Sequence, residues 1–363
     1  MASTPLFDFF HESTIPGQHP VKRPDGSEFV FPLVLEAPEI SLGNENSFEQ
    51  TEITESNIRA KTLTFIADNA QNLTNTLTKH GAILLRGLPG IKNAVDFDAL
   101  GKALNWKEFV YVNGAAPRTK VFGSVYTTNE GPADTTIAWH NEVAQSRSPP
   151  GRLIFACETP AAKSTGSTGV LHGPEAYALL QKTHPAFISA LLNQGIVYTR
   201  QLQEETNKAL NAGRGWKDTF NVTNKQDLDL ALKDLGITGT WLPDGSLLAA
   251  SPVLSGVRAD ERTSQTAFFN SICGAYYDVL NNPAAGAGTV HKFLAFGSTT
   301  ADGSAPVEGP SEEILASVYK SLDTIGVDIP WREGDVLLVD NYLVAHQRRA
   351  YSGPRRVYAS LWK

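Results

Sequence analysis

Apolar residues recur with a helical period early in the chain. From Ser56 onward they alternate in steps of three and four, as on the buried face of an α-helix. The stripe consists of Leu63, Ile66, Ala70, Leu73 and Leu77. We therefore expect a helix that begins at Ser56 and ends at Gly81, because glycine readily takes the left-handed conformation that closes a helix.

Short apolar runs rich in β-branched and aromatic residues predict strands. The first is 82–87, a buried strand ended by glycine, and a helix is expected next at 95–104. Further strands are expected at 29–35, 109–112, 120–126, 153–157, 335–340 and 356–361. Further helices are expected at 174–182, 185–193, 227–235 and 311–322. This mixture indicates an α+β body rather than an all-helical one.

The domain organisation predicted from this pattern is one domain over residues 1–363. A chain of 363 residues could hold two or three domains, but no internal repeat or shift in composition divides it. Residues 1 to about 50 are rich in proline, glycine and acidic residues and are expected to form an arm on the body. Residues from about 200 to 265 carry the weakest pattern, and we interpret them as an insertion that caps one end.

Charge and composition narrow the classes of partner. The net charge is −7, and no basic block appears, which argues against nucleic acid as a partner. The two cysteines lie far apart in sequence, so we do not expect a disulfide scaffold. We expect a reducing compartment instead. No apolar run is long enough to span a bilayer, and the N-terminus does not resemble a signal peptide. We expect a cytoplasmic protein that acts on a small molecule, without nucleic-acid or membrane partners; the oligomeric state stays open.

Candidate metal chemistry begins at His140-Asn141-Glu142. Residues two apart on an extended strand point to the same side, so His140 and Glu142 could share one ion. The tripeptide alone is a weak signal, and a second imidazole is needed. His346 follows an apolar strand and an Asp-Asn-Tyr turn and is the best candidate. Two imidazoles and one carboxylate on one face, with open positions opposite, suit Fe(II) and oxygen chemistry.

Arginines cluster after His346. A basic patch is more often a solvated surface than a site, yet Arg356 begins an alternating strand, and one arginine there would point inward. A buried arginine requires an anion. If His346 is a metal ligand, the carboxylate of a bound cosubstrate could supply that anion.

Taken in order, these motifs resemble the taurine/clavaminate-synthase-type Fe(II)/2-oxoglutarate dioxygenases. The resemblance rests on the segments 79–87, 139–142, 149–150, 158–160 and 334–341, together with His346 and 355–357. It implies a double-stranded β-helix (jelly-roll) core flanked by helices. It also implies that His140, Glu142 and His346 bind Fe(II).

The same resemblance implies the cosubstrates, 2-oxoglutarate and O2. Arg356 corresponds to the arginine that pairs with the distal carboxylate of 2-oxoglutarate, and Arg355 is its alternative. Thr168 corresponds to the threonine that helps to hold this carboxylate, and Thr165 stays open because the preceding loop is longer than usual.

Two departures from the family pattern bear on the substrate. The carboxylate ligand is Glu142, as in clavaminate synthase, where most relatives have aspartate. Ser360 stands where sulfonate-binding relatives have a second arginine, which argues against a taurine-like sulfonate. Candidate substrate-binding residues are the polar Gln145, Asn270 and Arg258, with Tyr111 and Asn113 also considered; structural hydrogen bonding is the competing interpretation for each.

The predicted reaction is oxidation of a small organic molecule with release of succinate and CO2. Hydroxylation is the default outcome, and desaturation or ring closure stay open. Two alternatives use the same His/Glu/His face: a non-catalytic metal-binding β-barrel and a zinc hydrolase. A buried arginine near the third ligand favours the dioxygenase, because neither alternative requires it.

Overall fold

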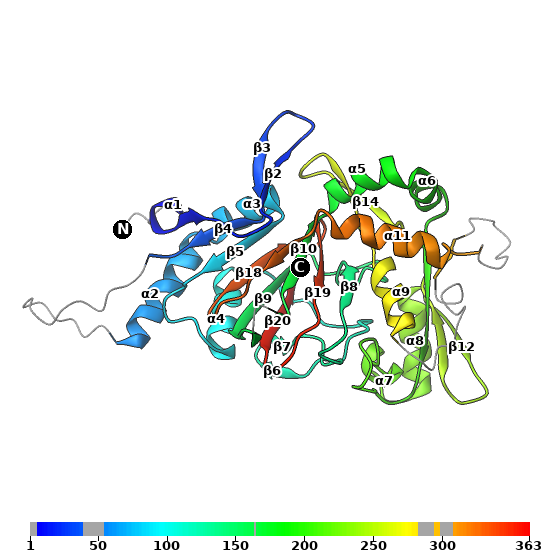
Figure 1. Ribbon diagram of the computed structural model, residues 1–363. Helices are drawn as coiled ribbons and strands as arrows, with labels where there is room; N and C mark the ends of the chain where they lie inside the picture. The colour runs from blue at the N-terminus through cyan, green and yellow to red at the C-terminus, as the bar shows by residue number, and fades with distance from the viewer. Residues whose placement is uncertain (1–5, 39–53, 163–164, 282–293, 298–307) are drawn as a thin grey trace, which may run out of the picture.

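The computed structural model describes residues 6–38, 54–162, 165–281, 294–297 and 308–363. Residues 1–5 and 39–50 of the predicted N-terminal arm therefore lie outside the described residues. The molecule is elongated (Figure 1). The N-terminal helix α2 (Glu55–Asp68) lies towards one end, the large sheets occupy the centre, and α8 (Lys225–Leu235) lies towards the other end.

The largest sheet has the strand order β1-β4-β5-β18-β9-β20-β7-β6. Its strands are β1 (His11–Ser13), β4 (Leu33–Glu36), β5 (Ala82–Arg86), β18 (Val336–Asp340), β9 (Arg152–Thr159), β20 (Arg356–Trp362), β7 (Val125–Thr127) and β6 (Lys120–Phe122). All pairs are antiparallel except β4 with β5. Strands β5 and β18 are buried along their whole length, which explains why the sequence shows continuous apolar runs there rather than alternation.

Alternate residues of this sheet enter two different cores. On β5, Ile83 and Leu85 pack with the N-terminal helices, whereas Ala82 and Leu84 face the second sheet. The helices of the first core are α1 (Leu6–Phe9), α2, α3 (Ala70–His80) and α4 (Ala94–Ala103). The central sheet is thus covered on both faces.

The second sheet carries His140 and His346. Its order is β17-β10-β19-β8, with antiparallel pairs throughout. Its strands are β17 (Val327–Ile329), β10 (Thr168–His172), β19 (Val344–Arg348) and β8 (Ile137–His140). Helices pack on its outer face through a third core, namely α5 (Gly173–Thr183), α6 (Pro185–Gln194), α9 (Ile272–Leu280) and α11 (Glu312–Asp323). The cavity described below lies against this sheet.

Residues 196–250, together with strand β16, form a further sheet and two short helices with a core of their own. The sheet order is β12-β13-β11-β16. The elements are β11 (Ile196–Leu202), α7 (Trp216–Phe220), α8, β12 (Thr238–Trp241), β13 (Leu247–Ala250) and β16 (Leu294–Phe296). Trp216, Phe220, Leu228 and Leu232 pack together in this core. Two hairpins also form, β2 (His19–Lys22) with β3 (Glu28–Phe31) and β14 (Val257–Asp260) with β15 (Gln265–Phe268).

Most of the expected elements form, with local differences. The single helix expected from Ser56 is two helices, because α2 ends and α3 begins at Asn69. Gly81 ends α3 with φ +73°, as predicted, and a Cβ there would lie 2.7 Å from Val344 Cγ2. The strand expected at 109–112 is wrong: only an isolated bridge, Glu108 with Trp362, forms near it. In the part of the chain that the structure describes, no helix has the length and apolar character to cross a membrane.

Candidate active site

His140 and His346 lie on neighbouring strands of the second sheet. They are paired in the register of β8 and β19, which brings their ring centroids to 4.2 Å. Both rings line one cavity. Strand pairing, rather than proximity in sequence, therefore supplies the second imidazole.

Glu142 follows the end of β8 and is held by its main chain. The Asn341 side chain accepts a hydrogen bond from the Glu142 N–H (2.8 Å) and donates one to its carbonyl oxygen (3.0 Å). Asn341 is fully buried, so these bonds are shielded from water. The next residue, Val143, has φ +54°, a conformation that β-branched residues rarely adopt. A sharp, strained turn thus follows the carboxylate.

Asn141 fastens the same turn from the other side. Its side chain donates to the carbonyl oxygens of Asn341 and Val344 and accepts from the Asn270 N–H. The three central residues of the motif thus divide their roles. His140 and Glu142 face the cavity, and the buried Asn141 connects β8 to the segment before β19.

The donor atoms of His140, Glu142 and His346 lie within 4.8 Å of one another. His346 Nε2 is 3.7 Å from Glu142 Oε2. His140 Nδ1 lies 2.8 Å from the Ala138 carbonyl oxygen, so this nitrogen carries the proton and Nε2 keeps its lone pair. Burial lowers the pKa of His140, opposed by Glu142, and holds the pKa of His346 well below its usual value. Both imidazoles are therefore neutral at pH 7, the form that binds a metal.

Arg118 is a component that the sequence did not indicate. Its Nη2 donates to Glu142 Oε2 at 2.8 Å, and both side chains are buried. The guanidinium lies over the Tyr111 ring, 5.0 Å from its centroid, and Arg214 lies over the same ring at 4.7 Å. Arg118 follows Pro117 in an irregular segment, where no periodicity marks a buried position.

The cavity has a volume of about 550 Å³, within the range of small-molecule sites. Besides the three residues above, Thr168 and Arg355 line it. Arg355 Nε donates to the Gly166 carbonyl oxygen at 2.8 Å, and its Nη2 lies 3.5 Å from Thr168 Oγ1. Burial, and secondarily Arg348, lower the pKa of Arg355 to about 10, which leaves it charged at neutral pH.

Arg356, expected to point inward, lies on the surface instead. Its side chain is 62% exposed and donates to Glu158 Oε2 at 2.6 Å. The register of β20 against β9 shifts between Arg356 and Val357, and the strand beyond is buried on both faces, so the sequence pattern could not decide between the two arginines and the resemblance pointed to the wrong one. The cavity-lining arginine is the alternative, Arg355. The other open threonine, Thr165, is exposed and does not line the cavity.

The predicted substrate residues separate into two groups. Gln145 lines the cavity, where its Nε2 donates to the Asn113 carbonyl oxygen. Asn270 does not: it is buried, and its side chain bonds the Gly256 carbonyl oxygen and the Ile272 N–H. Arg258 lines a different surface hollow, with its guanidinium 3.9 Å from the Tyr342 ring centroid. The structure therefore assigns Asn270 and Arg258 positions away from the cavity.

Two further charged residues line the cavity and were missed. Arg200 lies on β11 on the same face as the buried Ile196, Tyr198 and Leu202. Asp278 lies on the apolar helix α9. In each case the signal available in the sequence is a charged side chain within an otherwise apolar element.

Comparison with known proteins adds the family. Residues 49–362 match the family described as taurine catabolism dioxygenase TauD, TfdA. A clavaminate synthase-like protein of Arabidopsis thaliana is 36% identical over 294 residues, 80% of this chain and 84% of that protein. The dapdiamide synthesis protein DdaC of Enterobacter agglomerans is 27% identical over 335 residues, 92% of this chain and 93% of that protein. Among solved structures, PvcB from Pseudomonas aeruginosa has a TM-score of 0.48 and 15% identity, over 96% of this chain and 93% of that one.

The family match covers most of the chain, and the identity to the Arabidopsis protein extends over four-fifths of it. The chain therefore belongs to the TauD, TfdA family of Fe(II)- and 2-oxoglutarate-dependent dioxygenases.

Proposed function

We propose that His140, Glu142 and His346 hold the Fe(II) of this dioxygenase, and that the enzyme hydroxylates a C–H bond of a small molecule bound in the adjoining cavity. The observation that carries the proposal is the convergence of three donor atoms within 4.8 Å at the wall of that cavity. Two imidazoles and one carboxylate are the donor set typical of non-haem Fe(II) oxygenases.

The residues fit the metal in three respects. The imidazoles are neutral, and His140 directs Nε2 rather than Nδ1 to the metal. The Glu142 carboxylate can bind the ion while it also accepts from Arg118. The Asn341 clamp on the Glu142 main chain supports the ligand from behind, as outer contacts commonly do at metal sites. Fe(II), when bound, supplies the centre at which 2-oxoglutarate and O2 react.

Arg355 and Thr168 are proposed to bind the distal carboxylate of 2-oxoglutarate. Arg355 is the charged donor, and its Nε bond to Gly166 fixes the plane of the guanidinium. Thr168 Oγ1 already accepts from Trp331 Nε1 at 3.1 Å, which leaves its own proton free for a carboxylate oxygen. A planar guanidinium held in this way suits bidentate recognition of a carboxylate.

The arrangement of the two central sheets is consistent with a double-stranded β-helix, which we infer as the finer description of the core. The chain is taken as one domain, in which residues of about 200–265 cap the cavity. Support for the cap comes from Arg200, Gln203 and Asn207, which line the cavity from this region.

The net reaction balances as substrate C–H plus 2-oxoglutarate plus O2 giving substrate C–OH, succinate and CO2. One oxygen atom enters the substrate and the other enters succinate. The role of the protein is to hold the reacting C–H near the metal and the cosubstrate in one orientation. The zinc hydrolase alternative needs neither Arg355 nor Thr168.

The test uses purified protein with Fe(II), 2-oxoglutarate and O2. We expect slow succinate formation even without a substrate, and under anaerobic conditions the weak visible absorption of a metal-chelated keto acid. Both signals should disappear in His140→Ala and His346→Ala and persist in His184→Ala. The His184 side chain bonds Thr183 and Ser317 on the surface, which makes it a matched control.

Absence of both 2-oxoglutarate binding and succinate formation in the folded wild-type protein would refute the proposal. Activity with Zn(II) in place of Fe(II) would favour the hydrolase.

A further inference from the structure

Charge is unevenly distributed in the cavity. Among the described residues that line it, the charged groups are four guanidiniums (Arg118, Arg200, Arg348, Arg355) and two carboxylates (Glu142, Asp278). Fe(II) and 2-oxoglutarate carry opposite charges of equal size, so their binding does not remove this excess. The cavity therefore favours a substrate that brings an anionic group.

Most of these charges already have a partner or a proposed role. Arg118 is paired with Glu142, and Arg355 is assigned to 2-oxoglutarate. Both terminal nitrogens of Arg348 donate to main-chain carbonyl oxygens, those of Asn129, Pro132 and Thr135, which leaves only its Nε without a partner among the described residues. Arg200 and Asp278 remain.

Arg200 is incompletely bonded. Its Nη2 donates to Asn113 Oδ1 at 3.3 Å, whereas its buried Nη1 has no hydrogen-bond partner among the described residues. A buried charged donor without a partner is costly, and a ligand anion would relieve that cost. Burial lowers the pKa of Arg200 to about 10, so the group is still a cation at neutral pH.

Asp278 also lines the cavity, and it does not contact Arg200. The two interact electrostatically, but no ion pair or hydrogen bond joins them in the described part of the chain. Asp278 has no other partner there, and burial raises its pKa to about 7. A cation placed beside Asp278 would restore the ionised form.

We propose that Arg200 and Asp278 together bind an amino-acid-like zwitterion, with the substrate carboxylate on Arg200 and its ammonium group on Asp278. The proposal rests on the proposed function, because it names the substrate class of the same site. An unpaired acid and an unpaired base that line one cavity and do not meet leave room for a ligand that bridges them. Each end of the zwitterion neutralises one of the two groups, so neither stays unpaired in the cavity.

The strands and helices that carry the pair explain its rigidity. Arg200 lies within β11, paired with β13, and Asp278 lies in the last turn of α9, which packs against β8 beside His140. A Cβ on Gly274, one turn earlier in α9, would lie 3.3 Å from His140 Cβ. The ammonium site is thus carried by the same helix that contacts the metal-binding strand, which fixes the substrate relative to the proposed metal.

The test measures substrate-stimulated succinate formation by the Fe(II)-loaded enzyme with three matched panels. The first consists of L-α-amino acids, the second of the corresponding desamino and 2-hydroxy acids, and the third of the corresponding amino-acid amides. We expect stimulation from the first panel only. For the best amino acid, kcat/KM should exceed that of its desamino and amide analogues by about 100-fold or more, because each analogue leaves one charged group of the cavity unpaired.

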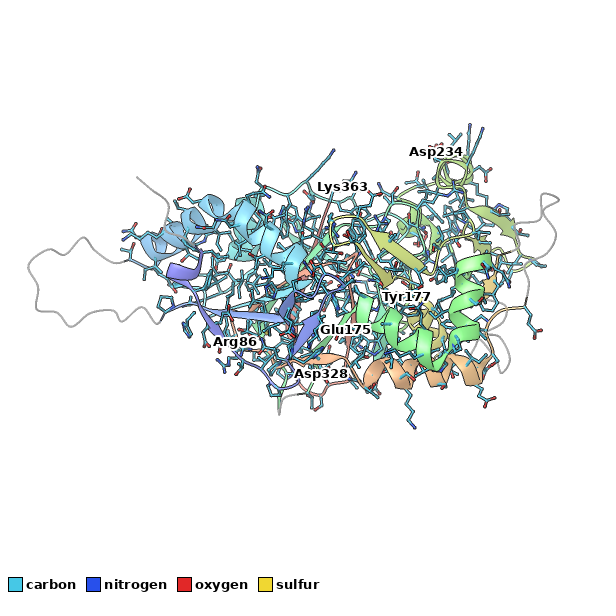
Figure 2. The ribbon with its side chains drawn as sticks, turned by 90° about the horizontal axis from the view of Figure 1, so that it is seen from above. Arg86, Glu175, Tyr177, Asp234, Asp328 and Lys363 are labelled. Atoms are coloured by element: carbon cyan, nitrogen blue, oxygen red, sulfur yellow. The ribbon has the colours of Figure 1, made fainter. Side chains whose placement is uncertain are left out.

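The variants Arg200→Gln and Asp278→Asn separate the two contacts. Arg200→Gln should lower kcat/KM for the amino acid by about 100-fold, mainly through KM. Asp278→Asn should lower kcat/KM for amino acids and raise kcat/KM for the 2-hydroxy acids relative to that of the amino acids. The reason is that an amide pairs with a hydroxyl better than with an ammonium group. Controls are Arg258→Gln, outside the cavity, and Asp234→Asn, at the outer edge of α8 (Figure 2).

Two outcomes would overturn the inference. One is equal stimulation by desamino acids or amides in the wild type, and the other is an unchanged preference in both folded variants. Succinate formation without substrate reports the metal and 2-oxoglutarate sites independently. If it occurs while no amino acid stimulates it, the inference fails and the proposed function stands; if it never occurs, the proposed function fails first.

Discussion

Replacement of Arg355 should abolish tight 2-oxoglutarate binding, whereas replacement of its neighbour Arg356 should not. Arg355 lines the cavity, and its Nε is held by the Gly166 carbonyl oxygen, so its terminal N–H groups, apart from the one of Nη2 directed at Thr168 Oγ1, are available to a carboxylate. Hydrogen bonds between charged groups are worth about 1.5–3 kcal/mol each. A bidentate contact makes two such bonds, and water that enters the cavity reduces their combined value to about 3–4 kcal/mol. This free energy corresponds to roughly 100- to 1000-fold in Kd.

The assay is anaerobic titration of the Fe(II)-loaded protein with 2-oxoglutarate, followed by the visible absorption of the chelated keto acid. Arg355→Gln should raise Kd by this factor without preventing Fe(II) binding. Arg355→Lys keeps the positive charge but loses the planar guanidinium. Its Kd for 2-oxoglutarate should therefore lie between that of the wild type and that of Arg355→Gln. Arg356→Gln is the matched control; its guanidinium is exposed and paired with Glu158, so Kd should change by less than about twofold.

The result that would refute the reasoning is wild-type affinity in a folded Arg355→Gln protein. Loss of affinity in Arg356→Gln would refute it equally, since the exposed side chain would then have to turn into the cavity. A simultaneous loss of Fe(II) in Arg355→Gln would show that the arginine supports the metal site rather than the cosubstrate.

Three further predictions concern stability and metal binding. Asn341→Leu should weaken metal binding about 10- to 100-fold, because the Glu142 main chain loses its clamp; unchanged affinity in a metal titration would contradict this. Arg86→Met leaves the buried Asp335 unpaired and should cost about 3–5 kcal/mol in urea unfolding. This loss should grow as pH rises, because burial already raises the pKa of Asp335 and Arg86 opposes that shift. Asp278 has a folded pKa of about 7 against 3.8 unfolded, so its contribution to stability falls as pH rises from about 4 to 7. At pH 8 the free energy of urea unfolding of Asp278→Asn should therefore exceed that of the wild type by about 2–4 kcal/mol, with no difference near pH 4; equal stability at both pH values would contradict the raised pKa of Asp278.

The enzyme class predicted from the order of motifs is confirmed by the family match, and so is the use of Fe(II) and 2-oxoglutarate that defines the family. The mixed α and β architecture is also confirmed, with the helices and buried strands close to their expected bounds. The reaction outcome and the residue roles stay predictions, to be decided by the experiments above.

Local sequence determined the parts of this protein that depend on local physics. The period of three and four residues predicted helix near residues 56–81, and continuous apolar runs predicted the buried strands β5 and β18. His140 and Glu142 could be paired because two positions along a strand face the same way. His346 could be added because its motif and order along the chain are specific.

Only the tertiary structure decided which charged groups meet. Strand β20 is buried on both faces and its register shifts after Arg356, so no alternation could distinguish Arg355 from Arg356. Arg200 and Asp278 line one cavity because β11 and α9 both border it, and nothing in either segment encodes the other. Side-chain partners across the fold depend on strand register and helix packing, which are properties of the whole chain rather than of any window within it.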